Sequence, residues 1–280
     1  MFCESWKFVS NKINQENIII QDFNNSNAIY NIIFNKKINF ILPLSNKDYN
    51  IIKNYNLSSY DIKILYPSKE TIELLHNKNL FTKFMLKNYF QYIPEIYYLE
   101  DIKLKDIEYP AIYKPKYSKS GIGVFIIHNE DYFLTIKDYN NIQKFIEDEY
   151  EYAAFMLCID GFIINWKIIR FKYKKYNIKC TNFPKNYENI VDFDINIFEN
   201  IIYKLNYSGG VCIDFKFNDL NNKLNIFEIN PRFGGSAFEC NFIYDLLCIK
   251  YYSFKIIKYY FKIITFFICV FIFKFISKFI

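Results

Sequence analysis

The chain has 280 residues, enough to bury a sizeable core as one large domain or as about two to three smaller ones. Hydrophobic residues make up 52% and aromatic residues 21% of the sequence, which argues against disorder over most of its length. The formal net charge is +6, but residues 246–280 hold six lysines and no acid, and the other 29 basic residues balance the 29 acidic ones. This distribution argues against a large nucleic-acid-binding surface on the body of the protein.

The N-terminal quarter predicts a small α/β unit. Residues 39–44 and 61–67 are apolar runs that end in turns, as buried strands do, and residues 47–56 between them have the pattern of a helix. Residues 68–75 predict a second helix, because the serine at its start can cap the first turn. A third helix is expected over residues 80–89.

The central and C-terminal parts alternate strands with short turns. Asp160-Gly161 and residues 218–223 each separate two apolar runs, which is the pattern of a β-hairpin. Residues 116–122 form a loop between two further strands. The expected strands cover residues 109–115, 123–127, 152–157, 162–173, 211–217 and 224–229.

Cysteine usage indicates the compartment. The seven cysteines include no Cys-x-x-Cys pair and their number is odd, so a zinc site or a disulfide framework is not expected. Buried reduced thiols are the simpler interpretation. Residues 1–10 lack the apolar run of a secretory signal, and we therefore expect a cytoplasmic protein.

Glycine and arginine are rare, at seven and two residues, in a sequence rich in Lys, Asn, Ile, Tyr and Phe. The abundant residues have AT-rich codons, so a glycine or arginine that persists is informative. Apart from Gly161 in its turn, the glycines occur as pairs beside polar residues at strand ends, where close approach of a ligand to the backbone requires glycine. These pairs are 121 and 123, 209 and 210, and 234 and 235.

One glycine pair lies in a loop that suits a polyphosphate. Lys114 ends a predicted strand, and Ser118, Ser120, Gly121 and Gly123 follow it. Backbone N–H groups and hydroxyls of such a loop can face an anion while the ammonium neutralises it. An ordinary hairpin loop is the alternative, because a lone Gly-x-Gly is a weak signal. The Walker A pattern is absent from the sequence.

A second group of polar residues has the chemistry of a metal site. Glu228 and Asn230 lie two residues apart on one predicted strand and share a face, and Asp214 on the paired strand is expected close by. Two carboxylates and an amide oxygen are the hard ligands that Mg²⁺ prefers. A solvated strand face is the alternative, but apolar residues flank both acids, and a buried acid without a partner is costly.

Arg232 follows this strand directly, before Gly234, Gly235 and Ser236. An arginine beside glycines and a serine can clamp a phosphate or a carboxylate. A surface charge after a strand is the alternative interpretation.

Residues 227–236 (FEINPRFGGS) resemble the metal-binding signature of the ATP-grasp superfamily, in the branch shared by the large subunit of carbamoyl-phosphate synthase and related carboxylate–amine ligases. The upstream segments occur in the family's order. Asn77-Lys78 takes the place of an Asp-Lys pair, with Asn in place of Asp, and Lys114 resembles the family's strand lysine. Both lysines contact the ATP phosphates in the family, and residues 118–124 resemble its glycine-rich lid.

The same resemblance implies a nucleotide site. Gln143, Lys144, Phe145 and Ile146 resemble the hinge that holds adenine through its backbone. Glu151 resembles the acidic position near the ribose.

The resemblance also implies the metal ligands and the catalytic groups. Asp214, Glu228 and Asn230 match the three ligands of the metal. Arg170 resembles a basic position on the central strand that faces the transferred phosphate, and Arg232 is the second expected catalytic residue.

The implied architecture is an α+β ATP-grasp fold, in which two α+β lobes grip ATP, preceded by a short α/β N-terminal subdomain. We expect that subdomain over residues 1–76 and the ATP-grasp domain over residues 77–247, with a lid at about 110–150. An apolar, lysine-rich tail covers residues 248–280.

The implied activity is that of an ADP-forming ligase that uses ATP with Mg²⁺ or Mn²⁺. A small-molecule carboxylate attacks the γ-phosphorus to give an acyl phosphate, and an amine or a thiol then displaces the phosphate. Nucleic acid is not an expected partner.

Two departures from the family leave other interpretations open. The N-terminal subdomain is short, and with Asn at position 77 this fits a catalytically degenerate ATP-binding protein. Residues 263–273 form an uncharged apolar run, shorter than the roughly 20 residues of a membrane span. A core helix is the simpler interpretation, but an acid-free basic tail can also lie on an anionic membrane, as in a membrane-associated interaction protein.

Overall fold

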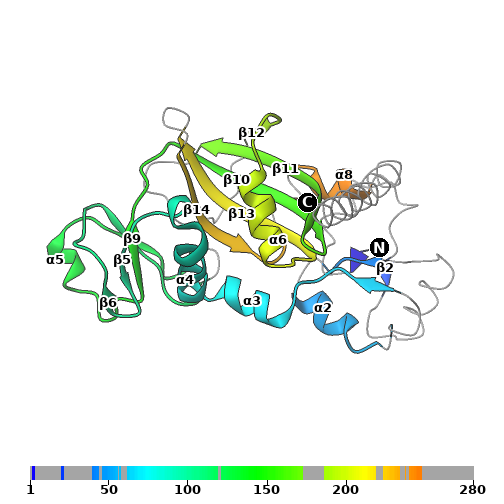
Figure 1. Cartoon of the computed structure of the whole chain (residues 1–280), viewed down its shortest axis with the longest axis horizontal. Helices are drawn as coiled ribbons and strands as arrows, with labels where there is room; N and C mark the ends of the chain where they lie inside the picture. Colours follow the sequence, from blue (N-terminus) through cyan, green and yellow to red (C-terminus); the bar gives the residue numbers. More distant parts are fainter. Residues whose placement is uncertain are drawn as a thin grey trace, which may run out of the picture.

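The structure is a computed structural model that describes residues 2–3, 20–21, 40–43, 46–55, 57, 62–118, 121–172, 186–218, 223–233, 237 and 240–247. Two five-stranded sheets form the centres of two lobes, with the smaller one at the left of Figure 1. The expected tail, 248–280, lies outside the described residues. Within the described part, no helix is long and apolar enough to cross a membrane.

A small α/β unit precedes the lobes, as predicted. Strands β3 (Phe40–Ile41) and β4 (Lys63–Ile64) pair in parallel, and α2 (Asn46–Ile52) lies between them in sequence. Their apolar side chains form a separate small core. Strands β1 (Phe2–Cys3) and β2 (Ile20–Gln21) form a second parallel pair.

Helices α3 (Lys69–His76) and α4 (Lys78–Tyr89) connect this unit to the lobes, and the short helix η4 (Phe90–Tyr92) follows them. The hydroxyl of Ser68 accepts from the backbone N–H of Thr71, so the predicted serine cap is confirmed. Asn77 lies between the two helices, and its Oδ1 accepts from the N–H groups of Asn79 and Leu80. This cap starts α4 two residues earlier than predicted.

The smaller lobe is built on a sheet of strand order β6-β5-β9-β7-β8. The two strands predicted here are β7 (Ala111–Tyr113) and β8 (Phe125–Ile127), which pair antiparallel, and the short helix α5 (Glu130–Phe133) follows. The sheet also contains β9 (Asn141–Lys144), β5 (Ile96–Leu99) and β6 (Ile102–Lys103). It therefore includes two strands that precede the segment expected to form the lid.

The larger sheet has the order β12-β11-β10-β13-β14, and both predicted hairpins are confirmed in it. Strands β10 (Tyr150–Ile159) and β11 (Phe162–Lys172) pair across Asp160-Gly161, which both have positive φ. Strands β13 (Gly209–Asn218) and β14 (Lys223–Asn230) form the second hairpin. Strand β12 (Tyr187–Ile190) adds an edge.

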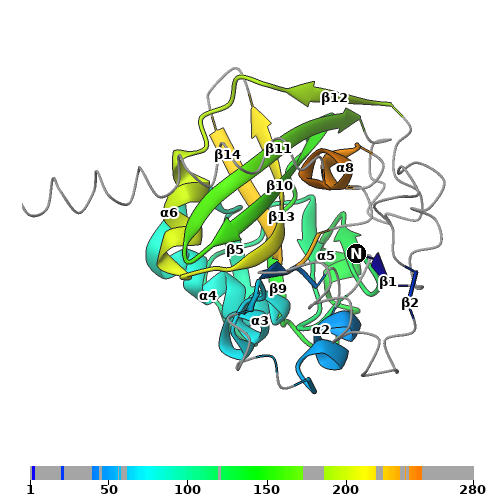
Figure 2. The ribbon, with the colours of Figure 1, turned by 90° about the vertical axis from the view of Figure 1, so that its right-hand side faces the viewer.

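Two helices cover opposite faces of this sheet (Figure 2). Helix α6 (Asn196–Lys204) packs on one face with Phe198, Ile201 and Ile202 in a core that includes residues of α4. Helix α8 (Phe242–Leu247) packs on the other face, where its apolar side chains join Phe155 and Phe233. Side chains that alternate along the central strands therefore enter one core or the other.

Candidate functional site

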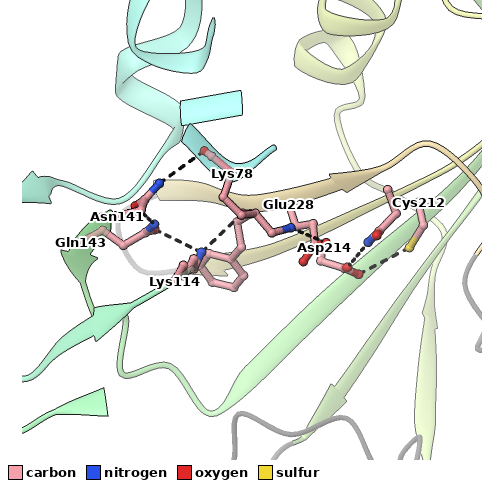
Figure 3. A network of polar contacts seen from close by, with 9 residues as sticks. Lys78, Lys114, Asn141, Gln143, Cys212, Asp214 and Glu228 are labelled. Atoms are coloured by element: carbon pink, nitrogen blue, oxygen red, sulfur yellow. Dashed lines mark hydrogen bonds and ion pairs between the residues drawn. The ribbon is translucent and has the colours of Figure 1, made fainter. Parts of the chain in front are cut away.

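The three predicted metal ligands share one face of the large sheet. Asp214 on β13 lies directly opposite Glu228 on β14, and Asn230 follows two residues later. They are on the α8 side, because Ile213 and Ile229 beside them enter the opposite core. Asn230 Nδ2 donates to Asp214 Oδ2 at 3.0 Å, and Cys212 Sγ donates to Asp214 Oδ1 at 3.4 Å (Figure 3).

The charge on this face favours a cation. The pKa of Asp214 is raised to about 7, mainly by burial and next by the negative charge of Glu228. Glu151 on β10 lies on the same face of the sheet as Asp214. Its pKa is also raised, mainly by burial and next by the negative charge of Asp214. The charges of these acids thus act on one another, and a bound cation would relieve their repulsion.

The donor set fits Mg²⁺. Two carboxylates and one amide oxygen are hard ligands, although the Asn230 amide must turn so that its oxygen, and not Nδ2, faces the ion. The described residues contain no group of three or more His, Cys, Asp or Glu side chains arranged for a metal. A three-ligand Mg²⁺ site here therefore requires the amide oxygen of Asn230 beside the two carboxylates.

Lys78 reaches the carboxylates from the start of α4. Its Nζ lies 2.5 Å from Glu228 Oε1, and its side chain is 5% exposed. Its backbone N–H donates to the carbonyl of Lys116 at 2.8 Å, which ties the start of α4 to the loop after β7. The Asn77 cap explains this placement. Because Asn and Asp cap helices about equally well, the Asn in the expected Asp-Lys pair preserves the position of the lysine.

Lys114 belongs to the smaller lobe and directly follows β7. Its Nζ donates to Gln143 Oε1 at 3.3 Å, lies 3.5 Å from the carbonyl O of Phe227, and is 5.5 Å from the centroid of the Phe227 ring. Phe227 is the extra residue of a β-bulge, because the register of β13 and β14 shifts between Asp214 and Phe215. Burial lowers the pKa of Lys114 to about 8, and the charge of Lys78 contributes.

The residues predicted to form the hinge lie on and just after β9. The backbone N–H groups of Lys144 and Phe145 donate to the carbonyls of Glu95 and Pro110. The Lys144 side chain points away, to an ion pair with Glu108 at 2.7 Å. The carbonyl of Ile146 accepts from the Nζ of Lys216 at 2.6 Å.

Sequence reasoning missed two of the residues in this region. Lys216 lies two residues after Asp214 on the same strand face, and its Nζ also donates to the carbonyl of Asp148 at 3.0 Å. Asn141 is buried beside Gln143. The sequence contains one signal for Asn141: it and Gln143 are two residues apart on one strand, so their side chains share a face.

The loop after Lys114 is described except for residues 119–120, so Ser120 lies outside the described residues. Gly121 and Gly123 have φ of 72° and 78°, a region that favours glycine. Just before Ser118, the Tyr117 hydroxyl donates to Glu73 Oε1 at 2.7 Å and accepts from Asn77 Nδ2 at 3.3 Å. These bonds hold the base of the loop against the junction of α3 and α4.

Arg170 does not lie with the other predicted residues. It is opposite Tyr152 in the register, and Tyr152 and Ile168 both enter the core on the α6 side. The arginine therefore points to the other face from Asp214, which corrects the expectation that it faces a transferred phosphate. Its Nη2 pairs with Glu188 at 2.5 Å, and its guanidinium lies 4.7 Å from the ring centroid of Tyr150.

Arg232 turns back on the end of β14. Its N–H donates to the Asn230 carbonyl at 2.7 Å, and its Nη1 donates to the Phe233 carbonyl at 3.3 Å. His76 lies near this group: burial lowers its pKa, and the charges of Arg232 and Lys78 lower it further. The sequence assigned no role to His76, because only the fold brings the end of α3 to β14.

The glycine pair at 209 and 210 packs against other parts of the protein. A Cβ at Gly210 would lie 2.7 Å from the Phe233 ring, and one at Gly209 would lie 3.0 Å from the Leu65 carbonyl. Both glycines are thus required by packing within the protein, which corrects the expectation of a ligand there. Gly234, Gly235 and Ser236 lie outside the described residues.

A family model and several known proteins match parts of this chain. The chain matches the family model of the ATP-grasp domain over residues 75–236, which is more than half of its length. It is 24% identical over 204 residues to the carbamoyl phosphate synthase large chain of Methanobrevibacter smithii, covering 63% of this chain and 18% of that protein. It is 37% identical over 83 residues to the D-alanine--D-alanine ligase of Petrotoga mobilis, covering 29% of this chain and 27% of that protein. The chain thus spans less than a third of each of these relatives.

Solved structures of two other proteins align with much of this chain. Biotin carboxylase from Campylobacter jejuni aligns with 77% of this chain and 54% of its own, at a TM-score of 0.49 and 16% identity. L-amino acid ligase from Bacillus licheniformis aligns with 71% of this chain and 56% of its own, at a TM-score of 0.45 and 16% identity. The family match and the two-lobed α+β architecture carry the conclusion: the chain belongs to the ATP-grasp family.

Proposed function

We propose that this protein is an ATP-dependent, ADP-forming ligase that joins a small-molecule carboxylate to an amine or a thiol through an acyl phosphate. One observation carries the proposal: Asp214, Glu228 and Asn230 form an oxygen-rich face that two lysines, Lys78 and Lys114, approach from different elements. Paired acids beside convergent lysines suit Mg·ATP, since the acids hold the cation and the lysines neutralise phosphate oxygens.

Each group has a role in this proposal. A bound Mg²⁺ supplies charge neutralisation at the phosphate oxygens that a carboxylate must approach. Lys78 and Lys114 bind the phosphates, and Arg232 at the end of β14 stabilises charge on the transferred group or on the substrate carboxylate. Gln143 to Ile146, with Lys216 on the Ile146 carbonyl, and Glu151 border the space for adenine and ribose. Ser118, Gly121 and Gly123 supply the covering loop.

The first test is Mg²⁺-dependent ATP binding, measured by calorimetry on the full chain. We expect binding that requires Mg²⁺ and that weakens about tenfold or more in Glu228→Gln, because the variant keeps the shape but loses the charge. Glu188→Gln is the matched control, since Glu188 pairs with Arg170 on the other face of the sheet and should leave affinity unchanged.

Binding would justify a screen of carboxylates with amines or thiols for ADP release. A folded protein that shows no Mg²⁺-dependent ATP binding would contradict the ligase proposal. Binding without ADP release from any pair would favour a catalytically degenerate nucleotide-binding protein.

A further inference from the structure

Two buried amides on β9 connect the lysines of the proposed phosphate site. Asn141 and Gln143 are 1% and 4% exposed, and Gln143 Nε2 donates to Asn141 Oδ1 at 3.0 Å. Asn141 Nδ2 in turn donates to the backbone carbonyl of Lys78 at 3.3 Å (Figure 3). It also donates to Thr82 Oγ1 at 2.8 Å. At the other end, Gln143 Oε1 accepts from Lys114 Nζ at 3.3 Å.

The donor and acceptor of each hydrogen bond in this series follow from the contact at Lys78. A backbone carbonyl can only accept, so the part of Asn141 that faces it must be the NH₂ group. Asn141 Oδ1 then faces Gln143, which has to donate to it, and Gln143 must therefore turn its own oxygen toward the ammonium of Lys114. A reversed amide would leave a buried polar atom unpaired or place NH₂ against an ammonium, and both are costly.

We propose that Asn141 is a positioning residue that sets both lysines for the phosphates of ATP. It holds the backbone of Lys78 directly, and it orients Lys114 through Gln143. This inference rests on the proposed function, because it assumes that the two lysines bind phosphate. Strand pairing does not depend on the Asn141 side chain, since the Lys114 N–H donates to the backbone carbonyl of Asn141 at 2.8 Å.

The test is Asn141→Leu, which is neutral, similar in size and unable to hydrogen-bond. Calorimetry on the full chain measures the affinity for Mg·ATP and for adenosine, which lacks the phosphates. We expect Mg·ATP affinity to fall about tenfold or more, as for the loss of hydrogen bonds that support a charged group, while adenosine affinity changes less than about twofold. Asn88→Ala is the matched control: this amide bonds the Phe84 carbonyl on the same helix, about three turns beyond Lys78, and its loss should change neither affinity.

A double-mutant cycle separates positioning from general damage. Gln143→Met keeps the backbone of the proposed adenine hinge and removes the bond to Lys114, while Asn141 still bonds the Lys78 carbonyl. It should therefore weaken Mg·ATP binding less than Asn141→Leu, and the double variant should be no weaker than Asn141→Leu alone. The inference would be overturned if the affinity losses of the two single variants add up in the double variant. It would also be overturned if Asn141→Leu loses affinity equally for Mg·ATP and adenosine, or loses none. If Asn141→Leu does not fold by circular dichroism, Thr82→Val takes its place in the ATP-to-adenosine comparison, because it removes the hydroxyl that accepts from Asn141 Nδ2. Absence of Mg·ATP binding in the unmodified chain would instead overturn the proposed function.

Discussion

The lowered pKa of Lys114 predicts that Mg·ATP affinity falls as the pH rises through about 8. Burial of the ammonium is the main cause of the shift, and the neighbouring charge of Lys78 contributes. A lysine with a pKa of about 8 is roughly nine-tenths protonated at pH 7 and roughly one-tenth protonated at pH 9. The phosphates of ATP are already ionised at pH 7. If binding requires the ammonium, affinity should therefore fall about tenfold over this interval.

The control must remove this titration and keep the charge. Lys114→Arg does so, because arginine stays protonated throughout the range. Asp214 and Glu151 have raised pKa values and also titrate near neutral pH, but they do so in both proteins. Calorimetric affinities at several values between pH 7 and pH 9 should thus show a steeper fall for the unmodified chain than for the variant, by up to about tenfold. Parallel curves would refute the assignment of the titrating group to Lys114.

The sign of the effect on folding is opposite. A lysine whose folded-state pKa lies below its unfolded value of about 10.5 disfavours the folded state while it is charged. This cost is fully present below pH 8 and is relieved as the pH rises from about 8 toward 10.5. The free energy of unfolding contributed by Lys114 should therefore rise over the range in which ATP binding weakens.

Two further predictions test the packing and the placement of single residues. Gly210→Ala should destabilise the protein by about 1–3 kcal/mol in urea unfolding, because its Cβ would overlap the buried Phe233 ring, and Phe233→Leu in the same chain should recover part of the loss. Arg170→Met should lower the thermal midpoint but change Mg·ATP affinity by less than about twofold, because the Arg170–Glu188 pair is on the other face of the sheet; a tenfold loss of affinity would restore the role expected from the sequence.

Local patterns predicted the elements that carry the site. The Asp160-Gly161 turn and the apolar runs around residues 218–223 located both hairpins, and the two-residue spacing of Glu228 and Asn230 placed them on one face. These predictions succeeded because the signals are short-range: turn chemistry and strand alternation need only a few neighbouring residues.

Arg170 shows what such patterns cannot decide. Its strand was predicted, but the direction of its side chain depends on the pairing of β11 with β10, and a one-residue difference in register reverses the face. The approach of His76 to Arg232 depends on how α3 packs against β14. Asn141 could not be assigned either, because its partners Thr82 and Lys78 are about sixty residues away in sequence.

The bulge at Phe227 has a consequence for how this site can change. Phe215 pairs with Ile226 and Asp214 pairs with Glu228, so removal of Phe227 would leave every other pair of the ladder in place. Phe227 belongs to neither of the two large cores, yet it supplies both the carbonyl and the ring that lie against Lys114. A single codon can therefore add or delete this support for the lysine while the sheet and its two carboxylates stay as they are.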